Sequence, residues 1–273
     1  MLVFVARIAP AESQPAIPQG RVFASIASTG AWLGPWRLCG LGRSLLRSPI
    51  DLTPFDREAD YWMQKRGLPE RLAAAVAGHL DRGLSALDLG CGGGRIAVAL
   101  APHMARVVGV DAARELVEQA ASTHPDVRFV HGDCLSDATW RQLGGPFDLV
   151  VSNCSIRRDY TPDLATLARL CSEHLVAGAG IALRIQADSD LAALLPQSVR
   201  TSLLYSKDEL ARAFAGFGSL RIETESYSQK FSSLAYLRTF LTRIGLPAER
   251  LTARNQRAVV GVRECYVLTG IKA

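Results

Sequence analysis

The sequence predicts an α/β fold with a doubly wound sheet of mostly parallel strands. The first observation is the stretch at residues 86–95, Ala-Leu-Asp-Leu-Gly-Cys-Gly-Gly-Gly-Arg, where an apolar run ends in a carboxylate and a glycine-rich turn follows. The second is that two later apolar runs also lead into acids, Asp111 and Asp133. Asp111 follows Asp88 by 23 positions, which leaves room for one helix and one strand of a βαβ unit.

The glycine-rich turn fits neither the dinucleotide-binding motif nor the phosphate-binding loop. A dinucleotide fingerprint, G-x-G-x-x-G, would place its third glycine on Arg95 when counted from Gly90. A phosphate-binding loop needs Gly-Lys-Ser/Thr, but Gly94 is followed by Arg-Ile. The pattern that remains is Asp-x-Gly-x-Gly-x-Gly. Its acid, Asp88, disfavours phosphate and suits a ligand with an ammonium group, while glycines let a ligand lie directly on the backbone.

Apolar spacing places the other elements in order along the chain. A segment at 53–81 has helical spacing and is broken at Gly67-Leu-Pro69. Ser206 and Glu209 have the spacing of a capping box and predict a helix start. After the strand that leads to Asp88 we expect strands at 106–110, 127–130, 147–151, 180–185, 219–225 and 258–271, the last antiparallel, and helices at 95–104, 112–121, 135–142, 162–173 and 233–244.

The acid, the glycines and the apolar strand before them resemble motif I of the class I S-adenosylmethionine (SAM)-dependent methyltransferases. The resemblance covers residues 84–185 well and 53–83 and 205–271 loosely. It implies a Rossmann-like, seven-stranded sheet in the order 3-2-1-4-5-7-6 with strand 7 antiparallel. Residues 55–62 and the segment before the last strand are loosely similar to malonyl-carrier-protein and trans-aconitate methyltransferases, which implies an N-terminal helical lid in which Tyr61 and Trp62 help to close the site. An amphipathic helix packed on the sheet edge is the alternative for 55–62.

The resemblance also implies the cofactor, SAM, and the residues that contact it. Asp111 would accept the ribose hydroxyls; the alternative role is the N-cap of the next helix, and both roles can hold at once. Asp133 would accept from the adenine amino group, unless it only caps a turn. The expected cofactor contacts are Asp88, Gly90, Cys91, Gly92, Gly94, Asp111, Ala112, Asp133, Cys134 and Asn153.

The acceptor side has weaker signals. Ser152–Ser155 replaces the Asn/Asp-Pro-Pro-aromatic sequence of many amino-group methyltransferases, and strands four and five do not end in the acids that metal-dependent relatives need, so no metal is expected. Cys154 is interpreted as a small core residue in preference to a catalytic thiol. Asp159 and Tyr160 are the candidate bases. Arg157 and Arg158 would suit an anionic acceptor, although a solvated pair of loop charges is the simpler interpretation.

Composition limits the partners and the compartment. The net charge is +5, but residues 1–50 contain five arginines and one acid, so the other 223 residues are nearly neutral and no nucleic-acid partner is expected. None of the six cysteines forms a Cys-x-x-Cys pair, which predicts reduced thiols in a cytoplasmic protein. No apolar run reaches the roughly 18 residues of a membrane span.

The sequence predicts two regions and one function. Residues 1–50 are expected to be a poorly ordered basic extension; their acid-poor composition also resembles an organellar transit peptide. Residues 51–273 would form the methyltransferase domain, with lid helices at 53–81 and an insert at 230–250 over the acceptor pocket.

The predicted reaction is in-line methyl transfer to a small molecule, at a carboxylate or hydroxyl oxygen. Alternatives are a catalytically silent SAM-binding partner subunit and N- or C-methylation of a metabolite, while Arg95 weakens a nicotinamide oxidoreductase. The oligomeric state is left open.

Overall fold

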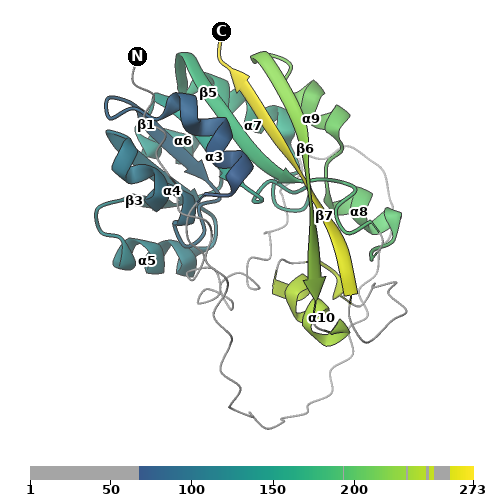
Figure 1. Ribbon diagram of the computed structural model, residues 1–273. Coiled ribbons are helices and arrows are strands. Elements are labelled where there is room, and N and C mark those ends of the chain that lie inside the picture. Colours follow the sequence, from purple (N-terminus) through teal and green to yellow (C-terminus); the bar gives the residue numbers. More distant parts are fainter. Residues whose placement is uncertain (1–67, 193, 232, 244–245, 249–258) are drawn as a thin grey trace, which may run out of the picture. The chain divides into compact units, whose positions relative to one another are not determined.

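One mixed sheet organises the protein (Figure 1). The computed structural model describes residues 68–273 except 193, 232, 244–245 and 249–258. The strand order is β3-β2-β1-β4-β5-β7-β6, and β7 runs antiparallel to both β5 and β6. The predicted strand order and the antiparallel last strand are therefore confirmed. The strands are β1 Ser85–Leu89, β2 Arg106–Asp111, β3 Arg128–His131, β4 Phe147–Asn153, β5 Leu175–Gln186, β6 Gly218–Phe231 and β7 Val259–Ile271.

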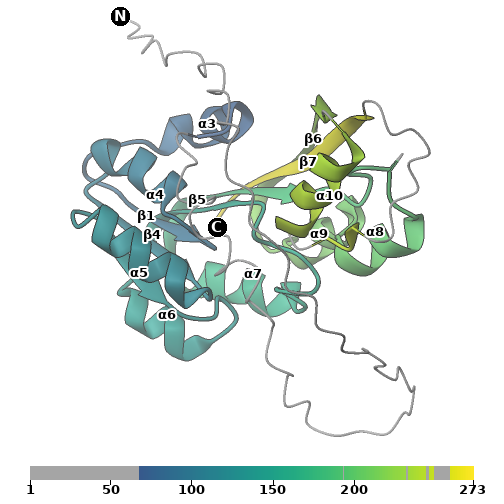
Figure 2. The same cartoon turned by 90° about the horizontal axis from the view of Figure 1, so that it is seen from below.

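Helices cover both faces of this sheet. Figure 2 shows α3 and α4 on one side of β1 and β4, and α6 and α7 on the other. Two buried clusters match these faces: one joins α3 and α4 to the sheet, and the larger one joins α6, α7 and α9. The helices are α3 Glu70–Val76, α4 Arg95–Leu100, α5 Arg114–Thr123, α6 Asp137–Leu143, α7 Leu164–Glu173, α8 Gln197–Leu203, α9 Lys207–Ala213 and α10 Leu234–Arg243.

Strand β1 shows how alternation positions the glycine loop. Successive strand residues point to opposite faces, and accordingly Ala86 belongs to the α3/α4 cluster while Leu87 and Leu89 belong to the other. Asp88 therefore shares the face of Ala86. That face carries α4, whose first turn begins directly after the glycines. The sequence thus places one acid between a buried strand and a helix N-terminus.

Four elements differ clearly from the sequence prediction. Strand β5 begins at Leu175, five residues before the predicted start at residue 180. The helix expected at 95–104 ends at Leu100 and continues as a 3-10 turn, Ala101–His103, because Pro102 has no N–H to extend α-helical bonding. Strand β6 extends to Phe231, six residues beyond the predicted end, because it keeps pairing with β7. The seven-residue helix α8 was not predicted; among its residues only Val199 is buried, so it has no apolar stripe to detect.

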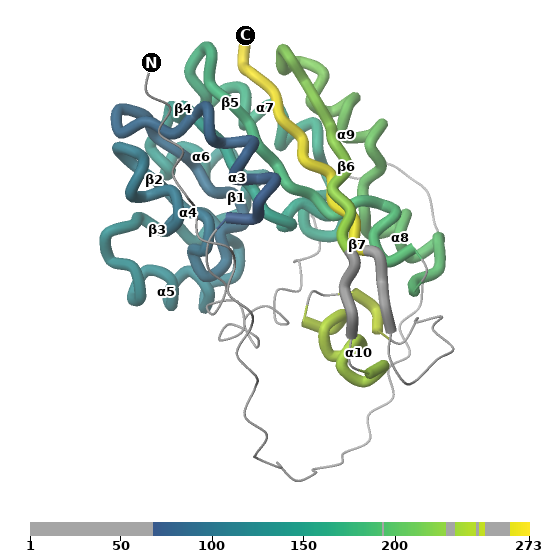
Figure 3. Tube along the Cα trace, viewed as in Figure 1, coloured from purple at the N-terminus to yellow at the C-terminus, as the bar shows by residue number. Residues whose placement is uncertain are grey.

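The last strand of the chain, β7, inserts between β5 and the edge strand β6. Figure 3 traces β7 between β5 and β6, with α10 preceding it in the chain. The helix expected at 233–244 is present as α10. Residues 1–50, the first part of the expected lid at 53–67 and Tyr61 lie outside the described residues. In the described part of the chain, no helix has the length and apolar character needed to cross a membrane.

Candidate active site

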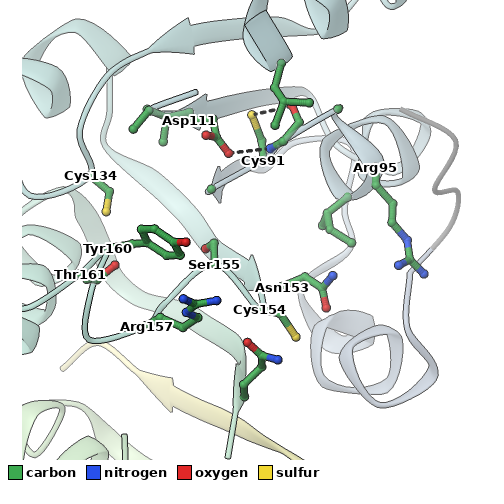
Figure 4. Close-up of a pocket in the computed structure, with 18 of the residues that line it drawn as sticks. Cys91, Arg95, Asp111, Cys134, Asn153, Cys154, Ser155, Arg157, Tyr160 and Thr161 are labelled. Carbon is green, nitrogen blue, oxygen red and sulfur yellow. Dashed lines mark hydrogen bonds between the residues drawn. The ribbon is translucent and has the colours of Figure 1, made fainter. Parts of the chain in front are cut away.

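A cavity of about 310 Å³ opens at the carboxyl ends of the parallel strands. The loops after β1, β2, β3 and β4 contribute one part of its wall, and Gln186, Phe240 and Arg263 contribute another. Figure 4 shows labelled side chains from these loops, among them Asp111, Cys134 and Tyr160, around one space. Ligands of open α/β sheets bind at this edge because loops from several strands converge there.

The loop after β1 is shaped by backbone that only glycine tolerates well. Gly90 has φ +65°, and a Cβ at this position would lie 2.1 Å from the Cβ of Ser155. The N–H groups of Gly90 and Cys91 both donate to the carbonyl of Val110, at 2.8 and 3.0 Å. Gly94, at φ +81°, is the N-cap of α4. The loop is therefore held tightly against β2 and β4, with its backbone facing the cavity.

Asp88 lies beneath this loop, and its side chain is buried rather than exposed to the cavity. Its Oδ2 accepts a hydrogen bond of 3.0 Å from the backbone N–H of Ala97 in α4. Its Oδ1 is buried and has no hydrogen-bond partner among the described residues. Burial raises the pKa of Asp88 to about 8, the Ala97 hydrogen bond opposes this, and the charge of Asp111 adds to it. The carboxyl group is thus poised between its neutral and ionised forms near neutral pH.

Asp111, at the end of β2, lines the cavity and organises two loops. Its Oδ2 accepts from the N–H of Gly92 and its Oδ1 from the N–H of Ala113, each at 2.8 Å. The second bond closes a turn ahead of α5; the N-cap of that helix is Ala113, so Asp111 does not take the N-cap role that was its alternative. The first was not anticipated, and it couples the two strand ends directly. Asp111 remains half-buried, so part of its carboxylate faces the cavity.

The loop after β3 adds a second acid and a thiol. Asp133 and Cys134 both line the cavity. Oδ1 of Asp133 accepts from the N–H of Leu135 at 2.8 Å, which is the turn-capping role. The carbonyl of Cys134 accepts from Nε1 of Trp140, a fully buried ring in α6, at 2.8 Å. Burial raises the pKa of the Cys134 thiol to about 12, so this sulfur stays protonated.

The far wall comes from Gln186 and Arg263, which sequence patterns did not single out, and from Phe240, which lies in the segment 230–250 expected over the acceptor pocket. Gln186 ends β5, Phe240 lies in α10 and Arg263 lies in β7. The guanidinium of Arg263 is buried and binds Asp190, with Nε at 2.8 Å from Oδ1 and Nη2 at 2.8 Å from Oδ2. The same guanidinium lies 5.1 Å from the ring centre of Phe240. These contacts tie the long β7 strand and α10 to one side of the cavity.

The loop after β4 separates two neighbouring arginines. Arg157 is buried, lines the cavity, and donates from Nε to Oδ1 of Asp159 at 3.0 Å. Arg158 is not part of the cavity wall; it binds Glu209 in α9 at 2.9 Å and lies over the Tyr205 ring. Among the two candidate bases, Tyr160 lines the cavity and Asp159 does not. Asn153 and Ala112, both expected at the cofactor, also line it.

Comparisons with known proteins match this geometry. Residues 86–178 fit the family model described as "Methyltransferase domain". The chain is 32% identical over 113 residues to trans-aconitate 2-methyltransferase of Azoarcus sp. (strain BH72), covering 41% of this chain and 42% of that protein. It is 30% identical over 111 residues to ubiquinone biosynthesis O-methyltransferase of Leptothrix cholodnii (40% and 46% covered), and 41% identical over 92 residues to release factor glutamine methyltransferase of Chlorobaculum tepidum (31% of each). The chain thus spans less than half the length of these relatives.

Solved structures share the fold at low sequence identity. A Bacillus halodurans protein assigned as a methyltransferase superposes with a TM-score of 0.56 at 16% identity, over 75% of this chain and 99% of that one. TehB of Haemophilus influenzae superposes with a TM-score of 0.51 at 14% identity, over 80% and 67%. The motif, the sheet order and the matched family model agree. Residues 86–178 of this chain therefore form a class I S-adenosylmethionine-dependent methyltransferase domain.

Proposed function

We propose that this protein binds SAM in the cavity and transfers its methyl group to a small-molecule acceptor. The observation that carries the proposal is the convergence of the glycine loop, Asp111 and the Asp133–Cys134 turn on one cavity, at three neighbouring strand ends. A second wall, from Gln186, Phe240 and Arg263, encloses further space next to them. One part of the cavity would hold the cofactor and the other the acceptor.

The glycine loop and Asp88 fit the aminoacyl end of SAM. The loop leaves backbone exposed where a Cβ would otherwise intrude, and the buried Oδ1 of Asp88 has no hydrogen-bond partner among the described residues. Because Asp88 is buried beneath the loop and does not line the cavity, an ammonium group bound at the loop would supply the missing donor through one bridging water. The added positive charge would also favour the ionised carboxylate, whose pKa burial has raised.

The nucleoside end fits the next two strand ends. Asp111 keeps part of its carboxylate toward the cavity while its two oxygens hold Gly92 and Ala113. Carboxylates accept strongly from hydroxyl groups, so a ribose is a suitable partner. Asp133 and the backbone N–H of Cys134 would serve the adenine edge in the same way. These roles would place the sulfur of SAM near Asn153.

The proposed reaction requires the protein mainly to position the acceptor against the methyl group. Bound SAM supplies a methyl group that its sulfonium already activates. The residues around the acceptor must hold a nucleophile in line at about 3–3.5 Å and exclude water. Arg157 and Arg263 give the wall cationic, buried groups that suit an acceptor with a carboxylate. A carboxylate acceptor needs no base, whereas a hydroxyl acceptor would use Tyr160, the candidate base that faces the cavity.

The relatives favour an oxygen acceptor. Two of them are named for trans-aconitate and for O-methylation in ubiquinone biosynthesis. A third is named for glutamine, but the Ser152–Ser155 sequence here lacks the Pro-Pro-aromatic segment typical of many amino-group enzymes. O-methylation of a carboxylate or hydroxyl is therefore the proposed reaction.

The test is incubation of the full chain with methyl-labelled SAM and a fractionated metabolite extract. We expect protein-dependent label in a small organic product, absent with the Asp111→Ala variant. Label only in protein or RNA would overturn the small-molecule assignment. If SAM binds by calorimetry and no fraction is labelled, the alternative of a silent SAM-binding subunit replaces the proposal.

A further inference from the structure

Two cysteines from distant parts of the chain meet beside the cavity. Cys154 follows β4 and Cys265 lies in β7, 111 residues later, yet their Sγ atoms are 3.9 Å apart. Strand β5 lies between β4 and β7, and its residues Arg184 and Gln186 pair with Asn153 and Cys265 respectively. The sheet topology itself therefore brings the two thiols together. Nothing in the family motif or the proposed methyl transfer uses them as a pair.

The backbone at Cys154 is unusual. Its φ is +60°, a left-handed conformation that residues other than glycine adopt rarely. A 2.6 Å hydrogen bond from its N–H to the carbonyl of Arg184 holds it there. Non-glycine residues in this conformation are often functional, because the surrounding structure must stabilise them.

Charged groups face Cys154 from two strands. Nη1 of Arg184 lies 3.1 Å from its Sγ, while Nε of the same guanidinium donates to Glu225 at 2.6 Å. Arg263, held by Asp190, is the second cation nearby. The hydrogen bond with Cys265, followed by the charges of Arg184 and Arg263, lowers the pKa of the Cys154 thiol, although burial and Asp190 oppose this. The same hydrogen bond and burial raise the pKa of Cys265.

The two sulfurs differ in access. Cys154 is only partly buried and lines the cavity, where Figure 4 shows it next to Asn153. Cys265 is fully buried and is not part of the cavity wall. A reagent in the cavity therefore reaches Cys154, whose pKa is lowered, before Cys265, whose pKa is raised. This is the arrangement of an attacking and a resolving cysteine.

We propose that Cys154 and Cys265 form an oxidation-sensitive dithiol at the acceptor end of the cavity, which hydroperoxides convert into a disulfide. The Cys154 thiolate attacks one peroxide oxygen, the O–O bond breaks, and the leaving oxygen takes a proton to become water or an alcohol. Cys154 is then a sulfenic acid. Cys265 loses its proton and attacks the Cys154 sulfur, the S–O bond breaks, and the hydroxide leaves as water. Two thiols lose two electrons and the peroxide gains them.

The step requires movement of the loop that carries Cys154. The sulfurs must approach from 3.9 Å to about 2.05 Å, and Cys154 belongs to a loop rather than to a strand interior. The disulfide would remove the thiolate that faces Arg184 and would draw the Cys154 side chain away from the cavity toward β7. Asp111 and the glycine loop are not part of this movement. Resting on the proposed function, oxidation should lower methyl transfer at least tenfold while SAM affinity stays within twofold, and dithiothreitol should restore transfer.

The thiol chemistry is tested without any methyl acceptor. The reduced full chain is treated with hydrogen peroxide, and cysteine peptides are mapped by mass spectrometry. We expect a Cys154–Cys265 disulfide in the unaltered chain. In Cys265→Ser, Cys154 should accumulate as a sulfenic acid that dimedone traps. In Cys154→Ser, Cys265 should remain a thiol. Absence of the disulfide, or oxidation of Cys265 at an unchanged rate in Cys154→Ser, would overturn the proposal.

A second measurement needs no variant. Iodoacetamide labelling of the unaltered chain at pH 7, read peptide by peptide, should modify Cys154 at least tenfold faster than Cys134, which lines the same cavity but has a raised pKa. Equal rates would contradict the proposal even if both serine variants failed to fold. Absence of methyl transfer by the reduced protein, with disulfide formation on oxidation intact, would count only against the proposed function, so the two failures are distinguishable.

Discussion

Asp111 and Gly92 form a 2.8 Å hydrogen bond from the backbone N–H of the glycine to the carboxylate at the end of β2. This single contact ties the first strand end to the second. The other oxygen of Asp111 holds Ala113 ahead of α5. The residue proposed to hold the ribose thus also shapes the loop proposed to hold the aminoacyl end, so the two halves of a nucleoside ligand would be recognised by one coupled unit.

Asp111→Ala should weaken SAM binding by about 10- to 100-fold, because hydrogen bonds to a charged group contribute about 1.5–3 kcal/mol. Titration calorimetry with SAM measures the change. Asp111→Asn is the matched control, because it keeps one acceptor for the loop but loses the charge. Its affinity for SAM should lie between that of the unaltered chain and that of Asp111→Ala. Unchanged affinity in Asp111→Ala would remove this residue from the cofactor site.

Asp88 predicts a pH-dependent stability. Burial raises its folded pKa to about 8, above an unfolded value of about 3.9. The folded state therefore holds a proton that the unfolded state has released between these pH values. The stability from this group is fully present below pH ~4 and is lost as pH rises through 8, at about 1.4 kcal/mol per pH unit in between.

The measurement is urea unfolding of the unliganded protein and of Asp88→Asn between pH 5 and pH 7. The variant cannot ionise at this position. The difference between its unfolding free energy and that of the parent should therefore increase by about 1.4 kcal/mol for each unit that the pH rises. A difference that is constant with pH would show that Asp88 is ionised in the folded protein. With SAM, the parent should release a proton on binding, detected by calorimetry in buffers of different ionisation enthalpy, and the variant should not.

Gly90 and Gly178 form a matched pair for the role of the loop. Both have positive φ, +65° and +79°, but a Cβ at Gly90 would meet Ser155 at 2.1 Å whereas none of the described atoms lies within 4 Å at Gly178. Gly178→Ala should cost only the left-handed backbone strain of about 1–2 kcal/mol. Gly90→Ala should cost a further 1–3 kcal/mol from overpacking, and should abolish SAM binding. Equal losses in urea unfolding would mean that the loop after β4 moves aside easily.

The sequence predicts a site residue well where its partners lie close to it along the chain, and poorly where they are far apart. Asp88, the glycines and Asp111 lie on one βαβ unit, where spacing along the chain determines spacing in space. Arg263, by contrast, reaches the cavity only because β7 returns between β5 and β6. No short-range pattern reports that return, and the same long-range pairing brings Cys265 to Cys154.

The charge pair Arg157–Arg158 illustrates a limit of a different kind. Adjacent residues in a loop can face opposite ways, and sequence does not say which. Here the first arginine is buried at the cavity and the second binds α9. The two arginines therefore lie in different environments, so the structure does not place them as a pair of guanidinium groups around one anion.

These two environments give the last prediction. Arg157→Met should lower kcat/KM for the acceptor about tenfold while leaving SAM affinity unchanged, because it removes a buried cation from the cavity wall; its partner Asp159 keeps a side chain that is 31% exposed and so stays solvated. Arg158→Met removes an ion pair with Glu209 at similar partial exposure and should cost about 1 kcal/mol of stability without affecting kcat/KM. Steady-state kinetics and urea unfolding on both variants separate these effects. Equal kinetic losses would mean that the loop as a whole, and not the side chain at the cavity, controls the acceptor.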